Sequence, residues 1–170
     1  MSRKLILDLA NMNDFDFFYN IKKQSENIYW TGFNSPPNVD GLFKWFYSII
    51  EKQTKSENRK IYIIKLLCDD LVEKCGYMYL DYINNNQCNA SIAVSNKFMN
   101  FGIGTKAINE FCIIARKMGF KEVIAEIRED NFKSQKIFSN NGFINIKESK
   151  KKKLENQLQK INMFKYKFIL

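Results

Sequence analysis

Two glycines, Gly102 and Gly104, stand between an apolar strand-like run at residues 90–94 and a long amphipathic run at residues 106–118. A strand, a glycine-containing turn and a helix in this order present free backbone N–H groups and the positive end of the helix, an arrangement that binds phosphate. The glycines let the backbone turn tightly and approach an anion closely. The segment therefore predicts a phosphate-binding turn.

A second group of residues with functional spacing follows one strand later. The β-branched run at residues 122–127 is followed by Asn131, Ser134, Phe138 and Gly142. Asn131 is a residue type that caps helix N-termini, and Gly142 suits the position just after a helix end. The spacing predicts a strand and then a short helix that Asn131 begins.

These two segments resemble the GNAT superfamily of acyl-CoA N-acyltransferases. That family carries [Gln/Arg]-x-x-Gly-x-[Gly/Ala] at a strand–helix turn and Asn-x-x-[Ala/Ser]-x-x-[Leu/Ile]-[Tyr/Phe]-x-x-x-Gly-Phe one strand later. Both patterns occur here in the same order, closely over the C-terminal half and in outline over the N-terminal half. The resemblance implies an enzyme that transfers an acetyl group from acetyl-CoA to a primary amine.

The resemblance also implies which residues bind the cofactor. The strand before the turn would pair with the pantetheine arm, the turn would hold the pyrophosphate, and the second helix would contact the arm. These residues are Ile92, Ala93 and Val94; Met99, Asn100, Phe101, Gly102, Ile103, Gly104 and Thr105; and Asn131, Ser134 and Lys136. Met99 replaces the family's Gln or Arg, which removes one side-chain contact. Asn131 as a pure helix cap and Lys136 as an ordinary surface lysine are the alternatives.

Glu126 lies five residues before Asn131, where ribosomal-protein N-terminal acetyltransferases have a glutamate proposed as a general base. A purely structural carboxylate is the alternative reading, and Asp81 and Glu73 are rival bases. Phe138 stands where many family members have a tyrosine that protonates the leaving thiolate, and phenylalanine has no proton to donate. The chain has no histidine to activate a serine or cysteine, so we expect direct attack by the amine without an acyl-enzyme.

An aromatic segment at residues 28–37 carries Trp30 and Phe33 and ends in two prolines, which predicts a loop. The resemblance places the acceptor site here, although a core role for Trp30 is equally compatible. An aromatic pocket favours a small amine, such as an amino sugar or a polyamine, over a protein N-terminus. A non-catalytic acyl-CoA-binding module is a further alternative, because Met99 and Phe138 both depart from the active pattern.

The elements that position these residues follow from apolar periodicity. We expect one α/β domain over residues 1–170, with a mixed twisted sheet of about six to seven strands flanked by about four helices. Residues 150–153 are expected in a solvated loop. The strands are predicted at residues 4–9, 60–68, 73–82, 87–95, 121–128, 143–147 and 163–169, and the helices after residue 14, at 40–53, at 102–118 and after residue 131.

Composition narrows the class of protein. The formal charge is +9, which suits an anionic cofactor, and no sequence motif for nucleic-acid binding accompanies it. No apolar run approaches the roughly 20 residues of a membrane span. The four cysteines lack metal-ligand spacing, so we expect no metal and a reducing, cytoplasmic location. The oligomeric state stays open.

Overall fold

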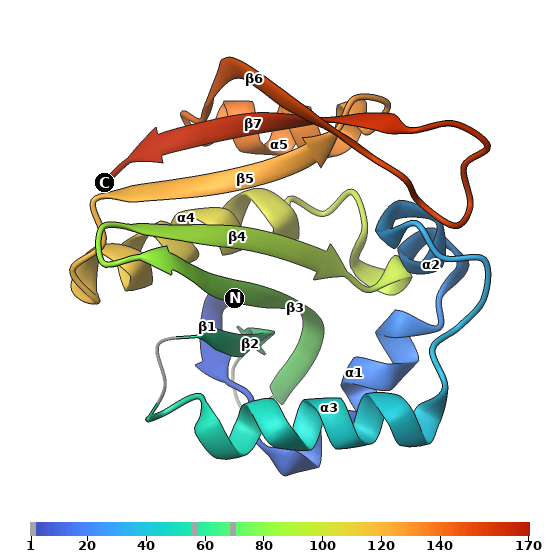
Figure 1. Ribbon diagram of the computed structural model, residues 1–170. Helices are drawn as coiled ribbons and strands as arrows, with labels where there is room; N and C mark the ends of the chain where they lie inside the picture. Colours follow the sequence, from blue (N-terminus) through green and yellow to red (C-terminus); the bar gives the residue numbers. More distant parts are fainter. Residues whose placement is uncertain (1–2, 56–57, 69–70) are drawn as a thin grey trace.

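The computed structural model describes residues 3–55, 58–68 and 71–170 and shows a twisted seven-stranded sheet (Figure 1). The strand order is β1-β2-β3-β4-β5-β7-β6, and only β4 and β5 pair in parallel among the described strands. The strands are β1 (Arg3–Leu9), β2 (Arg59–Cys68), β3 (Leu71–Asn84), β4 (Gln87–Val94), β5 (Glu122–Arg128), β6 (Ile144–Lys152) and β7 (Ile161–Ile169). The mixed α/β sheet expected from the sequence is confirmed.

Five α-helices accompany the sheet in the described part of the chain, one more than expected. None of them is long and apolar enough to cross a membrane. The helices are α1 (Phe15–Lys22), α2 (Ser25–Thr31), α3 (Val39–Lys52), α4 (Ile103–Lys117) and α5 (Phe132–Asn140), with short 3-10 turns η1 (Met12–Asp14) and η2 (Asn96–Phe98).

Helices cover both faces of the sheet, because side chains of a strand point alternately to either side. In β2, Ile61 and Ile63 join the aromatic core that Phe18 of α1 and Phe46 of α3 build. The alternate residues Tyr62 and Ile64 join the larger core under α4 and α5. Two apolar layers therefore hold the sheet between the helices, and β4 and β5 run through its centre (Figure 1).

Strands β4 and β5 separate along their length. They pair only at Gln87↔Glu122, Cys88↔Val123 and Asn89↔Ile124. Beyond these pairs β4 continues along β3 as far as Val94, and β5 continues along β7 as far as Arg128. The facing edges of β4 and β5 have no strand partner there among the described residues.

The turn into α4 needs the left-handed backbone that glycine permits. Gly102 caps the helix at φ 73°, and Asn100 before it has φ 67°. At Gly104 the small size of glycine matters, rather than its backbone freedom. A Cβ at this position would lie 3.4 Å from Ile137 of α5, so the small residue lets α4 and α5 pack closely.

Two boundaries differ from the prediction. Residues 28–31 form the end of helix α2 rather than a loop, because Gly32 at φ 88° acts as the C-cap of that helix and the prolines follow it. Residues 150–152 belong to β6, where they pair with β7 at residues 161–163, rather than to a loop.

Candidate active site

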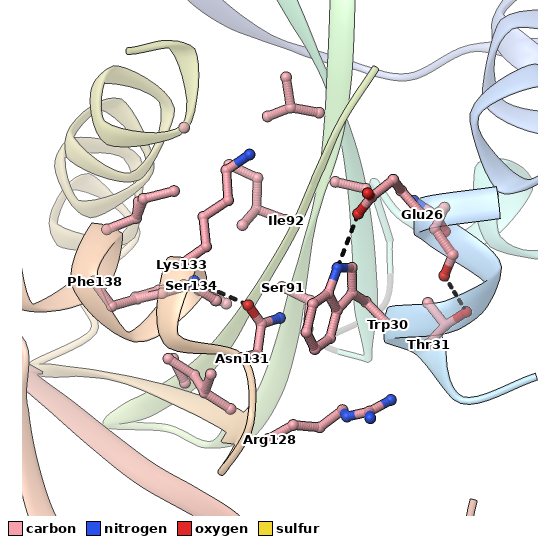
Figure 2. A pocket seen from close by; sticks show the side chains of 18 of the residues that line it. Glu26, Trp30, Thr31, Ser91, Ile92, Arg128, Asn131, Lys133, Ser134 and Phe138 are labelled. Carbon is pink, nitrogen blue, oxygen red and sulfur yellow. Dashed lines mark hydrogen bonds between the residues drawn. The ribbon is translucent and has the colours of Figure 1, made fainter. Parts of the chain in front are cut away.

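A cleft of about 920 Å³ opens where β4 and β5 separate (Figure 2). The start of α4 and helix α5 line one side of it, and α1 and α2 line the other. Every residue predicted for the site except Phe101 lines this cleft. The sequence prediction thus named residues that the fold brings together around one cavity.

Phe101 is the exception. Its side chain is 70% exposed and is not among the residues that line the cleft, because the turn directs it into solvent. Any contribution of Phe101 to a ligand would come from its backbone. Its neighbours in the turn, from Asn100 to Thr105, do reach the cleft.

The cofactor half of the cleft, defined here by β4, the turn, α4 and α5, has the chemistry that an acyl-CoA requires. The first turn of α4 contains no acidic residue, so its N–H groups keep their positive field. Lys133 and Lys136 of α5 also line the cleft. The free edge of β4 can pair with amide groups of an extended ligand as a further strand would. These residues fit coenzyme A.

Asn131 caps helix α5, as predicted. Its Oδ1 accepts a hydrogen bond from the backbone N–H of Ser134 at 3.0 Å. Figure 2 shows the amide nitrogen of Asn131 on the other side of that bond, toward α2. Capping therefore occupies one end of the side chain and leaves the other end toward the cleft.

Glu126 lines the cleft but is paired and partly solvated. Its Oε1 accepts a hydrogen bond from Lys150 Nζ at 2.7 Å, and its side chain is 38% exposed. The rival bases lie outside the lining of the cleft: Asp81 accepts two hydrogen bonds from Arg59, and Glu73 pairs with Lys97 at 2.8 Å. All three predicted carboxylates are thus neutralised by a cation.

Glu26 is a cleft carboxylate that the sequence analysis missed. Its Oε2 accepts a hydrogen bond from Trp30 Nε1 at 3.0 Å (Figure 2), and it has no cationic partner within 4 Å among the described residues. The spacing of four residues puts both side chains on one face of α2. The sequence hides this signal, because the prolines after residue 35 predict a loop over residues 28–31.

Arg128, also missed, anchors α2 at the cleft. Its guanidinium is 2% exposed, donates two hydrogen bonds to Asp130 at 2.9 and 2.7 Å, and donates a third to the backbone carbonyl of Tyr29 at 2.9 Å. It lies 5.0 Å from the ring centroid of Tyr29 and 5.1 Å from that of Trp30. Burial opposes the charge, but the bonds to Asp130 outweigh it, so the pKa of Arg128 is raised.

The connection between β6 and β7 holds α2 from a second side (Figure 1). Asn156 Nδ2 donates to the carbonyl of Tyr29 at 2.7 Å, and the Asn156 N–H donates to the carbonyl of Gly32 at 3.2 Å. A Cβ on Gly32 would lie only 2.8 Å from Leu154 Cδ2, so this glycine permits the close approach. Helix α2 itself has no buried residue and depends on these tethers.

A second cavity of about 410 Å³ adjoins the cleft on the side of α1 and α2. Its walls carry aromatic and proline side chains, including Phe33, Pro36 and Trp45. Five residues line both spaces and form the boundary between them: Lys22, Thr31, Phe33, Arg59 and Tyr79. On the side of α1 and α2 the cleft therefore continues into a second space.

Other groups in or near the cleft limit its chemistry. Phe138 is buried against Phe143, with ring centroids 5.0 Å apart, and supplies no proton. Burial raises the pKa of Cys75 and Cys112 to about 11 and that of Cys88 to about 12, so these thiols are protonated at neutral pH. No cysteine is among the described residues that line the cleft. Among the residues that the structure describes, no three His, Cys, Asp or Glu side chains form a group that could hold a metal ion.

Comparison with known sequences identifies the domain type. The sequence profile of the family described as "Acetyltransferase (GNAT) domain" matches residues 4–144. No curated protein sequence matches the chain. The match spans the turn, the separated strands and helix α5, so the residues of the cofactor half lie within it.

Solved structures share the fold at low sequence identity. A domain from Methanocaldococcus jannaschii is 20% identical, with 99% of this chain and 100% of that chain covered and a TM-score of 0.77. A spermidine N-acetyltransferase from Vibrio cholerae, in complex with CoA and spermine, is 12% identical, with 97% and 95% covered and a TM-score of 0.83. An acetyltransferase from Salmonella typhimurium that modifies the N-terminal serine of a 50S ribosomal subunit protein is 15% identical, with 98% and 95% covered and a TM-score of 0.79.

Proposed function

The chain belongs to the GNAT acetyltransferase family, and on this premise we propose that it transfers the acetyl group of acetyl-CoA directly to a primary amine of a small molecule. The observation that carries the proposal is the separation of β4 and β5 beside the turn into α4. It creates a cleft with a free strand edge at one end and helix N–H groups at the other.

Bound acetyl-CoA supplies an acetyl group activated as a thioester. The chain's own residues bind and orient it. Backbone groups of Ile92, Ala93 and Val94 would hydrogen-bond the pantetheine amides, and the amides of the turn would hold the pyrophosphate. Asn131, Ser134 and Lys136 would contact the cofactor from α5. Met99 lines the cleft without adding the usual polar contact.

The amine must lose a proton before it attacks, because an amine with a pKa of about 8 to 10 arrives mostly protonated at neutral pH. Glu126 remains a predicted base, but Lys150 neutralises it. Glu26 is the better-placed base in our proposal, because its carboxylate lines the cleft without a cationic partner among the described side chains. Phe138 gives the departing sulfur no proton, so we assign that role to water.

A small acceptor is favoured by the second cavity. The acceptor side continues past Trp30 and Phe33 into an aromatic space of about 410 Å³, a volume that suits part of a small molecule. The free cysteines in the described segments are typical of a reducing compartment, which supports the cytoplasm as the place of action.

The direct test is release of thiol from acetyl-CoA in the presence of a panel of primary amines. We expect release with at least one small amine and sequential kinetics. Absence of release with every amine would contradict the acetyltransferase proposal. Ping-pong kinetics, or a competent acetylated protein seen by mass spectrometry, would contradict direct transfer.

The placement of the cofactor is tested at Gly102. A Cβ there meets no atom within 4 Å, and asparagine and aspartate tolerate its left-handed backbone better than other residues. Gly102→Asp adds a negative charge beside the proposed pyrophosphate site, whereas Gly102→Asn imposes the same strain without charge. We expect acetyl-CoA affinity at least about tenfold lower in Gly102→Asp than in Gly102→Asn by calorimetry. Equal affinities would place the pyrophosphate elsewhere.

A further inference from the structure

We propose that the boundary between the cleft and the second cavity binds a carboxylate that the acceptor carries besides its amine. The acceptor would then be a small amino acid-like zwitterion rather than a polyamine. This inference rests on the proposed function, and it names the chemical class of the acceptor. Its basis is the charge of the residues shared by the two cavities.

Lys22 is the first of these charges. Its Nζ lies 5.3 Å from the ring centroids of Tyr77 and Tyr79, and 5.6 Å from that of Phe18. No described carboxylate lies within 4 Å of it. The aromatic rings hold the ammonium group at the boundary, and its charge is not neutralised by the protein.

Arg59 is the second charge. Its guanidinium lies 4.7 Å from the ring centroid of Tyr79 and 5.5 Å from that of Trp45. Asp81 accepts from its Nε and Nη2, which leaves the Nη1 donors outside that pair. Burial disfavours the charged guanidinium, yet the bonds to Asp81 raise the pKa of Arg59, so it remains a cation.

A cationic acceptor group would be repelled at this boundary. An ammonium ion can be attracted to the faces of aromatic rings. Here, however, the rings of Tyr79 and Trp45 already make cation–π contacts with Arg59, and the ring of Tyr79 makes a further one with Lys22. An anion, in contrast, would meet the ammonium group of Lys22, which has no carboxylate partner among the described residues, and the Nη1 donors that the Asp81 pair leaves on Arg59. A guanidinium and an ammonium group are the usual partners of a carboxylate.

The acidic residues nearby fit the same polarity. Glu26 lines the cleft, where its carboxylate can accept a hydrogen bond from the acceptor's ammonium group before that group loses its proton. Glu155 lines the second cavity but not the cleft, so it does not belong to the boundary between them; it is exposed to solvent, as Glu26 is. Glu26 thus lies in the cleft, and Lys22 lies at its boundary with the second cavity, so a zwitterion that spans the two positions would meet an opposite charge at either end.

The experiment compares ω-amino acids with diamines of equal chain length. In thiol-release assays we expect kcat/KM to be at least about tenfold higher for the best amino acid than for its matched diamine. Lys22→Met keeps the apolar stem and removes the charge, and it should abolish this preference. Lys22→Arg should retain it. Lys23→Met is the matched control, because Lys23 is exposed and lines neither cavity.

Binding without the cofactor separates this inference from the proposed function. Calorimetry of the protein alone with the same amino acids should show binding that Lys22→Met weakens and Lys23→Met does not. If such binding occurs but no amine is acetylated, the proposed function fails and the carboxylate site stands. A preference for diamines in both assays, or amino acid binding that is unchanged in a folded Lys22→Met variant, would overturn the carboxylate site.

Discussion

The two halves of the cleft are built in different ways. The cofactor half is lined by two nearby stretches, residues 92–105 and 131–136, and in our proposal it binds mainly through their backbone groups. The acceptor half, defined by the lining residues on α1, α2, β2 and β3, comes from side chains that are far apart in the chain, such as Lys22, Arg59 and Tyr79. A backbone site tolerates sequence change as long as the fold persists, whereas a side-chain site changes with single residues.

The comparison predicts that single side chains decide chemistry only in the acceptor half. Glu26→Gln keeps the size of the side chain and removes the proposed base. We expect kcat to fall by about 10²-fold, within the range of general-base catalysis, with acetyl-CoA affinity unchanged by calorimetry. Glu126→Gln is the matched variant, and we expect it to lose less because Lys150 neutralises that carboxylate. A larger loss in Glu126→Gln would return the role of base to Glu126.

The cofactor half should instead be vulnerable where backbones touch. A Cβ on Gly76 of β3 would lie 2.3 Å from the carbonyl oxygen of Ala93 in β4. Gly76→Ala should therefore displace β4, lower stability by about 1–3 kcal/mol in thermal denaturation and weaken acetyl-CoA binding. Gly41→Ala in α3 is the control, because its Cβ meets only Asn38 Oδ1 at 3.5 Å. Equal stability of the two variants would show that the contact between β3 and β4 is not critical.

Arg128 tests whether the halves are separable. It is a positioning residue that holds α2 through Tyr29, so Arg128→Met should release the acceptor wall. We expect the acceptor KM to rise several-fold while the Kd of acetyl-CoA stays constant, with a loss of stability of about 2–3 kcal/mol. Arg116→Met on the exposed side of α4 serves as the control. Parallel changes in KM and Kd would mean that the two halves move together.

The smallest effect on stability is expected at the contact between the end of β5 and β7. Glu129 accepts hydrogen bonds from the backbone N–H and from Nδ2 of Asn162, at 3.0 and 2.8 Å, and these bonds lower the pKa of Glu129. A lowered pKa in the folded state adds stability above the unfolded pKa of about 4.3 and loses it as the pH falls through the folded value. Wild type should therefore melt slightly above Glu129→Gln at pH 7, and the difference should vanish in acid. A difference that does not change with pH would rule out this linkage.

The same contrast explains what could be predicted from the sequence. The turn at Gly102, the cap at Asn131 and the order of strand, turn and helix from β4 to α4 follow from local patterns within one stretch of chain, and the structure confirms these elements. Phe101 shows the limit, since a turn pattern does not say which side chain points outward. The sequence does not predict that Lys22 and Arg59 line the same boundary, because they come to lie near one another only after α1 packs on the sheet.

Helix α2 was missed for a related reason. Its seven residues bury no side chain, and an isolated helix of that length is unstable in water. Tertiary tethers, rather than local propensity, therefore make it helical. Glu26 is positioned by those tethers, which is why it can be proposed as a base only with the structure at hand.

One of those tethers, the contact of Leu154 and Asn156 with α2, lies beyond residues 4–144, the part that matches the family profile. Descendants of this protein could alter the length or sequence of that connection, and so shift the proposed acceptor wall, without touching the segments proposed to bind the cofactor. Acceptor choice can thus diverge at low risk to the shared chemistry. For a protein engineer, residues 153–160 are the first place to graft loops from relatives when a new amine is wanted.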